Sequence, residues 1–181
     1  YRLAHLGVQP SRIIGDLDSM ADPAAWRAAG VAVDAVAEQD TTDFEKCLYR
    51  TEAPLYLAVG FTGVRVDHTL AVLNTLVRRA DKRVILVAER EVIFPLPPGR
   101  RLRLEMAPGD TVSIFPLAPL RCAPSQGLTW PLDGLVFAPG QRIGTSNRAL
   151  GGPMEIGFED PGALVFLPHD CLPALIEATA P

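Results

Sequence analysis

The stretch RIIGDLDS (residues 12–19) runs from a short apolar segment directly into two aspartates, Asp16 and Asp18, which are separated by one residue. The apolar segment is typical of a buried strand. In an extended chain, residues i and i+2 point to the same side, so the two carboxylates converge if the extended geometry persists through Leu17. Two carboxylates about 4 Å apart repel by roughly 4 kcal/mol at an effective dielectric near 20, and a bound cation relieves that repulsion. The stretch therefore predicts a strand end that holds Mg²⁺, with an Asx-type turn in water as the alternative.

The segments around this stretch alternate between strand and helix patterns as far as residue 90. Strands are expected at residues 12–15, 31–37, 55–59 and 83–88. One helix is expected after the N-cap Asp22 with Pro23 at its first position, and another after Thr42, which forms a capping box with Glu45. A third helix is expected over residues 67–80, with an apolar face made of Leu70, Leu73, Leu76, Val77 and Ala80. Strands separated by helices predict an α/β fold, with a mostly parallel sheet and flanking helices.

The pattern changes after about residue 90, where short apolar runs are separated by proline and glycine. Strands are expected near residues 91–94, 101–106, 111–115, 127–130, 134–137, 154–159 and 163–167, and a helix over 172–178. Many short strands between turn residues are typical of a small all-β sandwich or barrel. We therefore expect two domains, an α/β domain over residues 1–90 and a β-sandwich over residues 91–181.

Composition excludes several classes of function. The formal net charge of −4 gives no electrostatic footprint for nucleic acid, and no apolar run reaches the roughly 18 residues that a membrane span requires. The three cysteines lie far apart without CxxC spacing, which argues against a disulfide framework and a structural zinc site. We expect a protein of the reducing cytoplasm that binds neither nucleic acid nor membrane.

A second candidate site is the stretch EQDTTDFEK (38–46), which joins a strand to a helix N-terminus. Helix capping alone accounts for Thr42 and for acidic residues in the first turn, but it does not account for Asp40. We expect Asp40 and Asp43 to face the same crevice as Asp16 and Asp18, at the carboxyl edge of the sheet. Lys46, one turn further on, is either a phosphate contact or an exposed helix lysine.

A third candidate is GFTGVRVDHT (60–69), again between a strand and a helix. Gly60 and Gly63 allow close approach of a ligand, and the Arg65 guanidinium suits phosphate oxygens. Asp67 is either a further member of the acidic cluster or a helix cap, and we expect His68 to be a packed or surface imidazole. Three successive strand ends with polar loops indicate a ligand site at one sheet edge.

These motifs, GDLDS, QDTTDFEK and GVRVDH, together with GLTWPLDG (127–134) and GTSN (144–147), resemble those of the thiamine pyrophosphokinase family, in the same order along the chain. The resemblance implies an ATP-binding α/β domain, whose first strand would precede Tyr1, followed by a thiamine-binding β-sandwich. It implies a homodimer with active sites across the subunit interface. It also implies transfer of a diphosphoryl group from ATP to the thiamine hydroxyl, with AMP leaving.

The resemblance also assigns roles to residues of this chain. The acidic catalytic cluster would be Asp16, Asp18, Asp43 and Asp67, of which Asp16, Asp18 and Asp43 would hold Mg²⁺. The residues expected to line the ATP phosphates are Gln39, Asp40, Thr42, Lys46 and Arg65. Ser146 and Asn147 would contact the thiamine pyrimidine, with a simple turn as the alternative reading of GTSN. Trp130 would either stack near the ligand or be a buried core residue. Of these two alternatives, we expect a buried core residue.

Three other functions compete with this one. A pterin pyrophosphokinase would use the same phosphate chemistry on another acceptor. A haloacid-dehalogenase-like phosphohydrolase would use Asp16 as nucleophile, but it leaves TTDFEK and RVDH without a role. A non-catalytic thiamine or nucleotide binder is the alternative outside enzymology.

Overall fold

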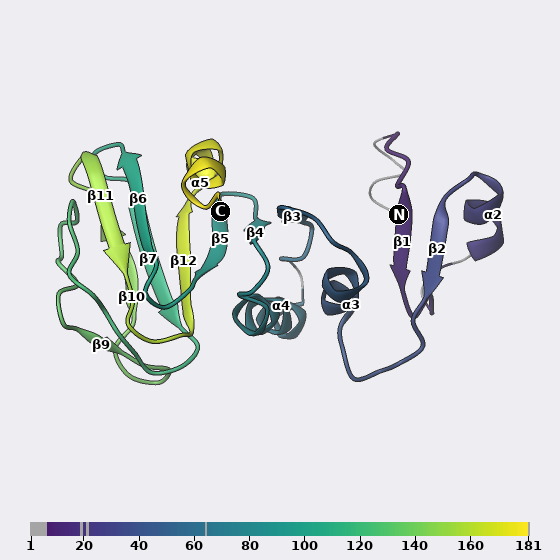
Figure 1. The fold of residues 1–181 in the computed structure, drawn as a ribbon, viewed down its shortest axis with the longest axis horizontal. Helices are drawn as coiled ribbons and strands as arrows, with labels where there is room; N and C mark the ends of the chain where they lie inside the picture. Colours follow the sequence, from purple (N-terminus) through teal and green to yellow (C-terminus); the bar gives the residue numbers. More distant parts are fainter. Residues whose placement is uncertain (1–6, 19, 21, 64, 181) are drawn as a thin grey trace. The chain divides into compact units, whose positions relative to one another are not determined.

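The computed structural model describes residues 7–18, 20, 22–63 and 65–180. The chain divides into two compact units, Tyr1–Ala53 and Pro54–Pro181, which are described separately below. Figure 1 shows the elements of each unit along the chain. The fold is mixed α/β, with several sheets and few helices.

The first unit is built on two parallel strands, β1 (Arg12–Gly15) and β2 (Ala32–Ala35), connected through the helix α2 (Pro23–Ala28). The Asp22 carboxylate accepts a hydrogen bond from the Ala25 amide at 3.0 Å, so the predicted cap of α2 is confirmed. The helix α3 (Asp43–Arg50) follows β2, and the Thr42 hydroxyl accepts from the Glu45 amide at 3.3 Å. Local capping signals therefore place both helix starts correctly.

The second unit contains a six-stranded sheet in the order β10-β7-β12-β5-β4-β3. Its first two strands along the chain, β3 (Tyr56–Val59) and β4 (Val84–Val87), are parallel and are connected by α4 (Val66–Arg78). The other strands are β5 (Glu91–Leu96), β7 (Thr111–Pro116), β10 (Gly144–Arg148) and β12 (Ala163–Pro168). Because β4 pairs antiparallel with β5, the sheet continues across residue 90.

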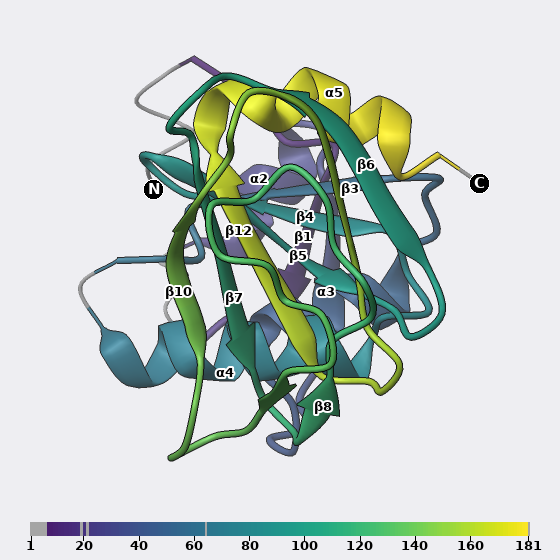
Figure 2. The ribbon, with the colours of Figure 1, turned by 90° about the vertical axis from the view of Figure 1, so that its left-hand side faces the viewer.

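A second layer covers this sheet and completes a β-sandwich, which Figure 2 shows from the side of the second layer. It consists of the antiparallel pair β6 (Arg101–Met106) and β11 (Gly152–Gly157), with the short pair β8 (Leu120–Arg121) and β9 (Val136–Phe137) beside it. The 3₁₀ turn η1 (His169–Cys171) and the helix α5 (Leu172–Ala178) end the chain. Alternate residues of β6 are buried, namely Leu102, Leu104 and Met106, and they belong to the core between the layers.

The mostly parallel sheet expected for the first half is matched in part. The pairs β1–β2 and β3–β4 are both parallel, but they belong to different sheets. The run 127–130 is not a strand, since only Leu128 forms an isolated bridge, with Ala149. None of the helices in the described part of the chain has both the length and the hydrophobicity that crossing a bilayer requires.

The predicted apolar face of α4 is also wrong at one end. Leu76 is fully buried, but Leu70 is 56% exposed. The buried positions on α4 are Val72, Thr75 and Leu76, which share one face at helical spacing. Apolar character alone did not identify which leucines face the sheet.

Candidate functional site

The aspartates of the opening motif follow β1 in a turn. Strand β1 ends at Gly15, and Leu17 has φ 65°, so the extended geometry that would make Asp16 and Asp18 converge does not persist. Instead, the Asp18 amide donates to Asp16 Oδ1 at 3.1 Å, which is an Asx-type turn. A left-handed conformation costs a leucine about 1–2 kcal/mol, and such strained residues cluster at functional sites.

Asp43, from the second motif, lies at the end of the same strand. A Cβ atom placed on Gly15 would come within 3.0 Å of Asp43 Oδ1 and 3.3 Å of its Cγ. Glycine at the end of β1 therefore leaves the space that the Asp43 carboxylate occupies. In this way, the fold of the first unit brings Asp43 to the strand end that continues into Asp16.

Lys46 lies behind Asp43, one turn further along α3. Its side chain is buried, with 1% of the residue exposed, and its Nζ lies 3.7 Å from Asp43 Oδ1. The alternative of an exposed helix lysine is therefore wrong. Lysine is rarely fully buried without a paired charge, and Asp43 supplies such a charge.

The loop before α3 is organised by Glu38, a residue that the sequence analysis did not identify. Its carboxylate accepts hydrogen bonds from the Asp40 amide at 2.8 Å, the Thr41 amide at 3.0 Å and the Tyr49 hydroxyl at 2.8 Å, and also from the Thr41 hydroxyl. These hydrogen bonds lower the pKa of Glu38 to about 2, and the bond from the Thr41 hydroxyl contributes most. Gln39, Asp40 and Thr42 are exposed around this anchored loop.

The oxygen donors of the first unit fit a hard divalent cation in kind. Asp16, Asp18 and Asp43 all carry carboxylates at or just beyond the end of β1, where Gly15 leaves room for Asp43. Among residues 7–18, 20, 22–63 and 65–180, however, no three acidic, histidine or cysteine side chains are grouped so as to hold a metal ion. Mg²⁺ commonly takes one or two carboxylates and fills its other positions with water and substrate phosphate, so this donor set suits Mg²⁺ with a phosphate co-ligand.

The third motif belongs to the second unit, where Arg65 and Asp67 pair with each other. Arg65 Nη2 donates to Asp67 Oδ2 at 2.6 Å, and Arg65 Nε donates to Asp67 Oδ1 at 3.3 Å. This two-point contact lowers the pKa of Asp67 from its ordinary value. Both side chains are about two-thirds exposed, so the pair is open to a ligand. His68 is exposed, in agreement with its expected surface role.

The GTSN motif forms strand β10, so its reading as a simple turn is wrong. The register between β10 and β7 shifts between Gly144 and Asn147, and Ser146 between them has φ 62°. The Ser146 amide donates to the Ser113 hydroxyl of β7 at 2.9 Å. The bulge therefore presents an exposed Ser146 beside a buried Asn147.

Asn147 holds the segment that carries Trp130. Its side chain is buried, its Oδ1 accepts from the Trp130 and Arg148 amides at 3.1 and 2.8 Å, and its Nδ2 donates to the Trp130 carbonyl at 2.7 Å. Trp130 is 57% exposed, so the expectation that it is a buried core residue is wrong. The exposed indole is therefore attached to a backbone that Asn147 holds in place.

A hollow of about 320 Å³ adjoins this region. Ser113, which bonds to the Ser146 amide, is one of its lining residues. The others include Arg90, Glu91, Thr111, Phe166 and Pro168. The lining combines an aromatic ring with hydroxyls and charged groups.

Comparison with known proteins gives one family for both halves of the chain. Residues 1–87 match the family described as thiamin pyrophosphokinase, catalytic domain, and residues 101–161 match thiamin pyrophosphokinase, vitamin B1 binding domain. Thiamine pyrophosphokinase 1 of Oryza sativa subsp. japonica is 30% identical over 155 residues, which cover 77% of this chain and 59% of that protein. The chain thus spans somewhat less than two-thirds of the length of this relative.

Solved structures show the same fold at lower identity. The thiamine pyrophosphokinase from Bacillus subtilis superposes with a TM-score of 0.72 at 22% identity, covering 92% of this chain and 81% of that one. The thiamin pyrophosphokinase from Candida albicans superposes with a TM-score of 0.74 at 16% identity, covering 90% and 74% of the two chains. With both domain models matched in order along the sequence, this chain belongs to the thiamine pyrophosphokinase family.

Proposed function

We propose that this protein transfers a diphosphoryl group from ATP to the hydroxyl of thiamine, giving thiamine diphosphate and AMP, with Mg²⁺ as cofactor. The observation that carries the proposal is the packing of Asp43 against Gly15, because it leaves carboxylate oxygens beside the strand end that continues into Asp16. The two matched family domains support the same substrates. No observation favours a pterin acceptor, an aspartyl-phosphate phosphohydrolase or a binder without activity.

ATP binding is proposed for the α/β part, residues 1–90, with Gln39, Asp40, Thr42, Lys46 and Arg65 at the phosphates. The exposed positions of Gln39, Asp40, Thr42 and Arg65 support this assignment. Lys46 is buried, so its Nζ would act from behind Asp43, and its positive charge would hold that carboxylate in place. Mg²⁺, held by Asp16, Asp18 and Asp43, would neutralise charge on the phosphate oxygens.

Thiamine binding is proposed for residues 91–181, with Ser146, Asn147 and Trp130 at the substrate. Trp130 supports this role through its exposed indole, which offers an aromatic face to a flat ring. Asn147 would act through the backbone of Trp130, because its amide group is already bonded to it. Ser146 would contact the substrate directly from the bulge of β10.

The proton of the thiamine hydroxyl would be accepted by Asp43 or Asp67. Arg65 lowers the pKa of Asp67, which makes Asp67 a weaker base than an unpaired aspartate as long as the two remain paired. Asp43 keeps its carboxylate 62% exposed while one oxygen faces Lys46. If the Arg65 guanidinium formed its ion pair with an ATP phosphate instead of with Asp67, the Asp67 carboxylate would be free to accept the proton.

We further propose a cytoplasmic homodimer with active sites at the subunit interface. Three free cysteines, Cys47, Cys122 and Cys171, support a reducing compartment, since none of them is in a disulfide. The dimer is proposed on the resemblance to the family, and sedimentation of the full chain would test it.

The activity is tested by incubating the full chain with ATP, Mg²⁺ and thiamine and measuring AMP and thiamine diphosphate. A parallel reaction with hydroxymethyl-dihydropterin tests the rival acceptor. We expect Asp16→Asn and Asp67→Asn to lower turnover by more than about a hundredfold while the fold is kept. The matched control is Asp81→Asn, which changes an exposed aspartate paired with Arg79 and should keep full turnover. Near wild-type rates in Asp16→Asn and Asp67→Asn would refute the acidic-cluster assignment.

A further inference from the structure

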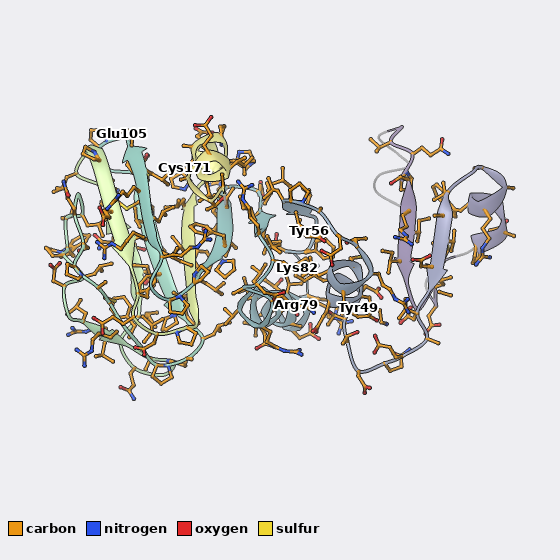
Figure 3. The ribbon with its side chains drawn as sticks, viewed as in Figure 1. Tyr49, Tyr56, Arg79, Lys82, Glu105 and Cys171 are labelled. Carbon is orange, nitrogen blue, oxygen red and sulfur yellow. The ribbon has the colours of Figure 1, made fainter. Side chains whose placement is uncertain are left out.

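The carboxylate of Glu38 holds the middle of the loop between β2 and α3. Glu38 Oε2 accepts from two consecutive backbone amides, those of Asp40 and Thr41. Glu38 Oε1 accepts from two hydroxyls, those of Thr41 and of Tyr49. Tyr49 lies on α3, where Figure 3 labels it, so the carboxylate ties the loop to the helix that follows it.

The loop held in this way carries most of the proposed phosphate contacts of the first unit. Gln39 and Asp40 are exposed on it, and Thr42 ends it as the cap of α3. Fixing the backbone of a residue costs conformational entropy, which an unanchored loop would have to lose when a ligand binds. A loop that is already fixed avoids that loss at the binding step.

We propose that Glu38 is a positioning residue, which fixes residues 39–42 in the conformation that receives the ATP phosphates without touching the nucleotide itself. The inference rests on the proposed function, since it gives the loop its ligand. Glu38 is ionised at neutral pH, which strengthens each of its four accepted bonds. Its two oxygens are both occupied by donors of its own chain, so they are not available as ligands.

Two substitutions separate a positioning role from a role of the charge. Glutamine keeps one acceptor oxygen for the two amides, and its NH₂ group can donate to the Thr41 and Tyr49 hydroxyls, because hydroxyls also accept. Glu38→Gln should therefore retain the loop, while Glu38→Ala removes every bond. The matched control is Glu105→Ala, which removes an exposed carboxylate from β6 in the second unit.

The first measurement is amide hydrogen exchange of the full chain without nucleotide. We expect the Asp40 and Thr41 amides to exchange at least about tenfold faster in Glu38→Ala than in wild type, and within about threefold of wild type in Glu38→Gln. If Glu38→Ala does not fold, Thr41→Val and Tyr49→Phe each remove one hydroxyl donor and should accelerate the same amides to a smaller extent. The proposal would be overturned if the Asp40 and Thr41 amides exchanged at the wild-type rate in Glu38→Ala, or in both Thr41→Val and Tyr49→Phe.

The second measurement is steady-state kinetics. Glu38→Ala should raise KM for ATP by about tenfold with kcat within about threefold and KM for thiamine unchanged, and Glu38→Gln should restore most of the affinity for ATP. If KM for ATP rose as much in Glu38→Gln as in Glu38→Ala, the negative charge of Glu38 would itself be required, and the positioning role would be overturned. A wild-type chain without AMP formation would refute the proposed function, and the exchange experiment would still decide whether Glu38 fixes the loop.

Discussion

Replacing Gly15 with alanine tests whether the end of β1 is shaped for the Asp43 carboxylate. The added Cβ would lie 3.0 Å from Asp43 Oδ1. Gly15 is not one of the glycines with positive φ, so alanine fits the backbone, and the three atoms nearest to the added Cβ all belong to Asp43. Because 62% of the Asp43 side chain is exposed, the carboxylate has room to move away.

The size of the effect follows from this contact. Ordinary carbon–oxygen contacts begin near about 3.4 Å, so Asp43 must move by roughly half an ångström. Catalytic groups tolerate displacements of about 0.5 Å, and about 1 Å costs roughly a hundredfold, so we expect kcat/KM of Gly15→Ala to fall about tenfold.

A double-mutant cycle with Asp43→Ala isolates the contact. Alanine in place of glycine normally stabilises a compatible site by about 0.4–1 kcal/mol, because the unfolded chain loses freedom. In the Asp43→Ala background, Gly15→Ala should show this gain, and in the native background the conflict should cancel it, giving a coupling of about 1 kcal/mol. Urea denaturation measures all four proteins. Equal stability changes in both backgrounds, with kcat/KM unaltered, would refute the reasoning.

Three further predictions concern the second unit. Asn147→Ala should lower the free energy of unfolding by about 2–4 kcal/mol, because it leaves the Trp130 amide and carbonyl unpaired. The control Ser146→Ala should change the free energy of unfolding by less than about 0.5 kcal/mol. Equal losses of stability for the two variants in urea denaturation would contradict this prediction. Arg65→Ala should raise the pKa of Asp67 toward 3.8, and in wild type the stabilisation from this pairing is present above that pH and is lost as pH falls below it; an unchanged pKa in an NMR titration would count against the pairing. Trp130→Ala should raise KM for thiamine about three- to tenfold and leave KM for ATP unchanged, and a reversed pattern in the kinetics would remove Trp130 from the thiamine site.

The sequence by itself determined the features that depend on neighbours a few residues away. The N-terminal caps at Asp22 and Thr42 were predicted from residue types at fixed spacing, and the structure confirms both. The order of motifs also indicated the thiamine pyrophosphokinase family, which the matches over residues 1–87 and 101–161 confirm. Such features can be predicted from the sequence because a cap or a motif is a local arrangement of hydrogen-bonding groups.

Tertiary structure decided everything that depends on which surface another segment covers. Trp130 is exposed against expectation, and Lys46, for which a phosphate contact and an exposed position were both open, is buried, because the packing of the folded chain sets the burial of each side chain. Glu38 was missed because its contact with Tyr49 spans eleven residues, although its bonds to Asp40 and Thr41 are local. Composition and spacing therefore specify which chemical groups are available. Packing specifies which of these groups face a ligand, because the burial of a side chain depends on contacts that no local pattern contains.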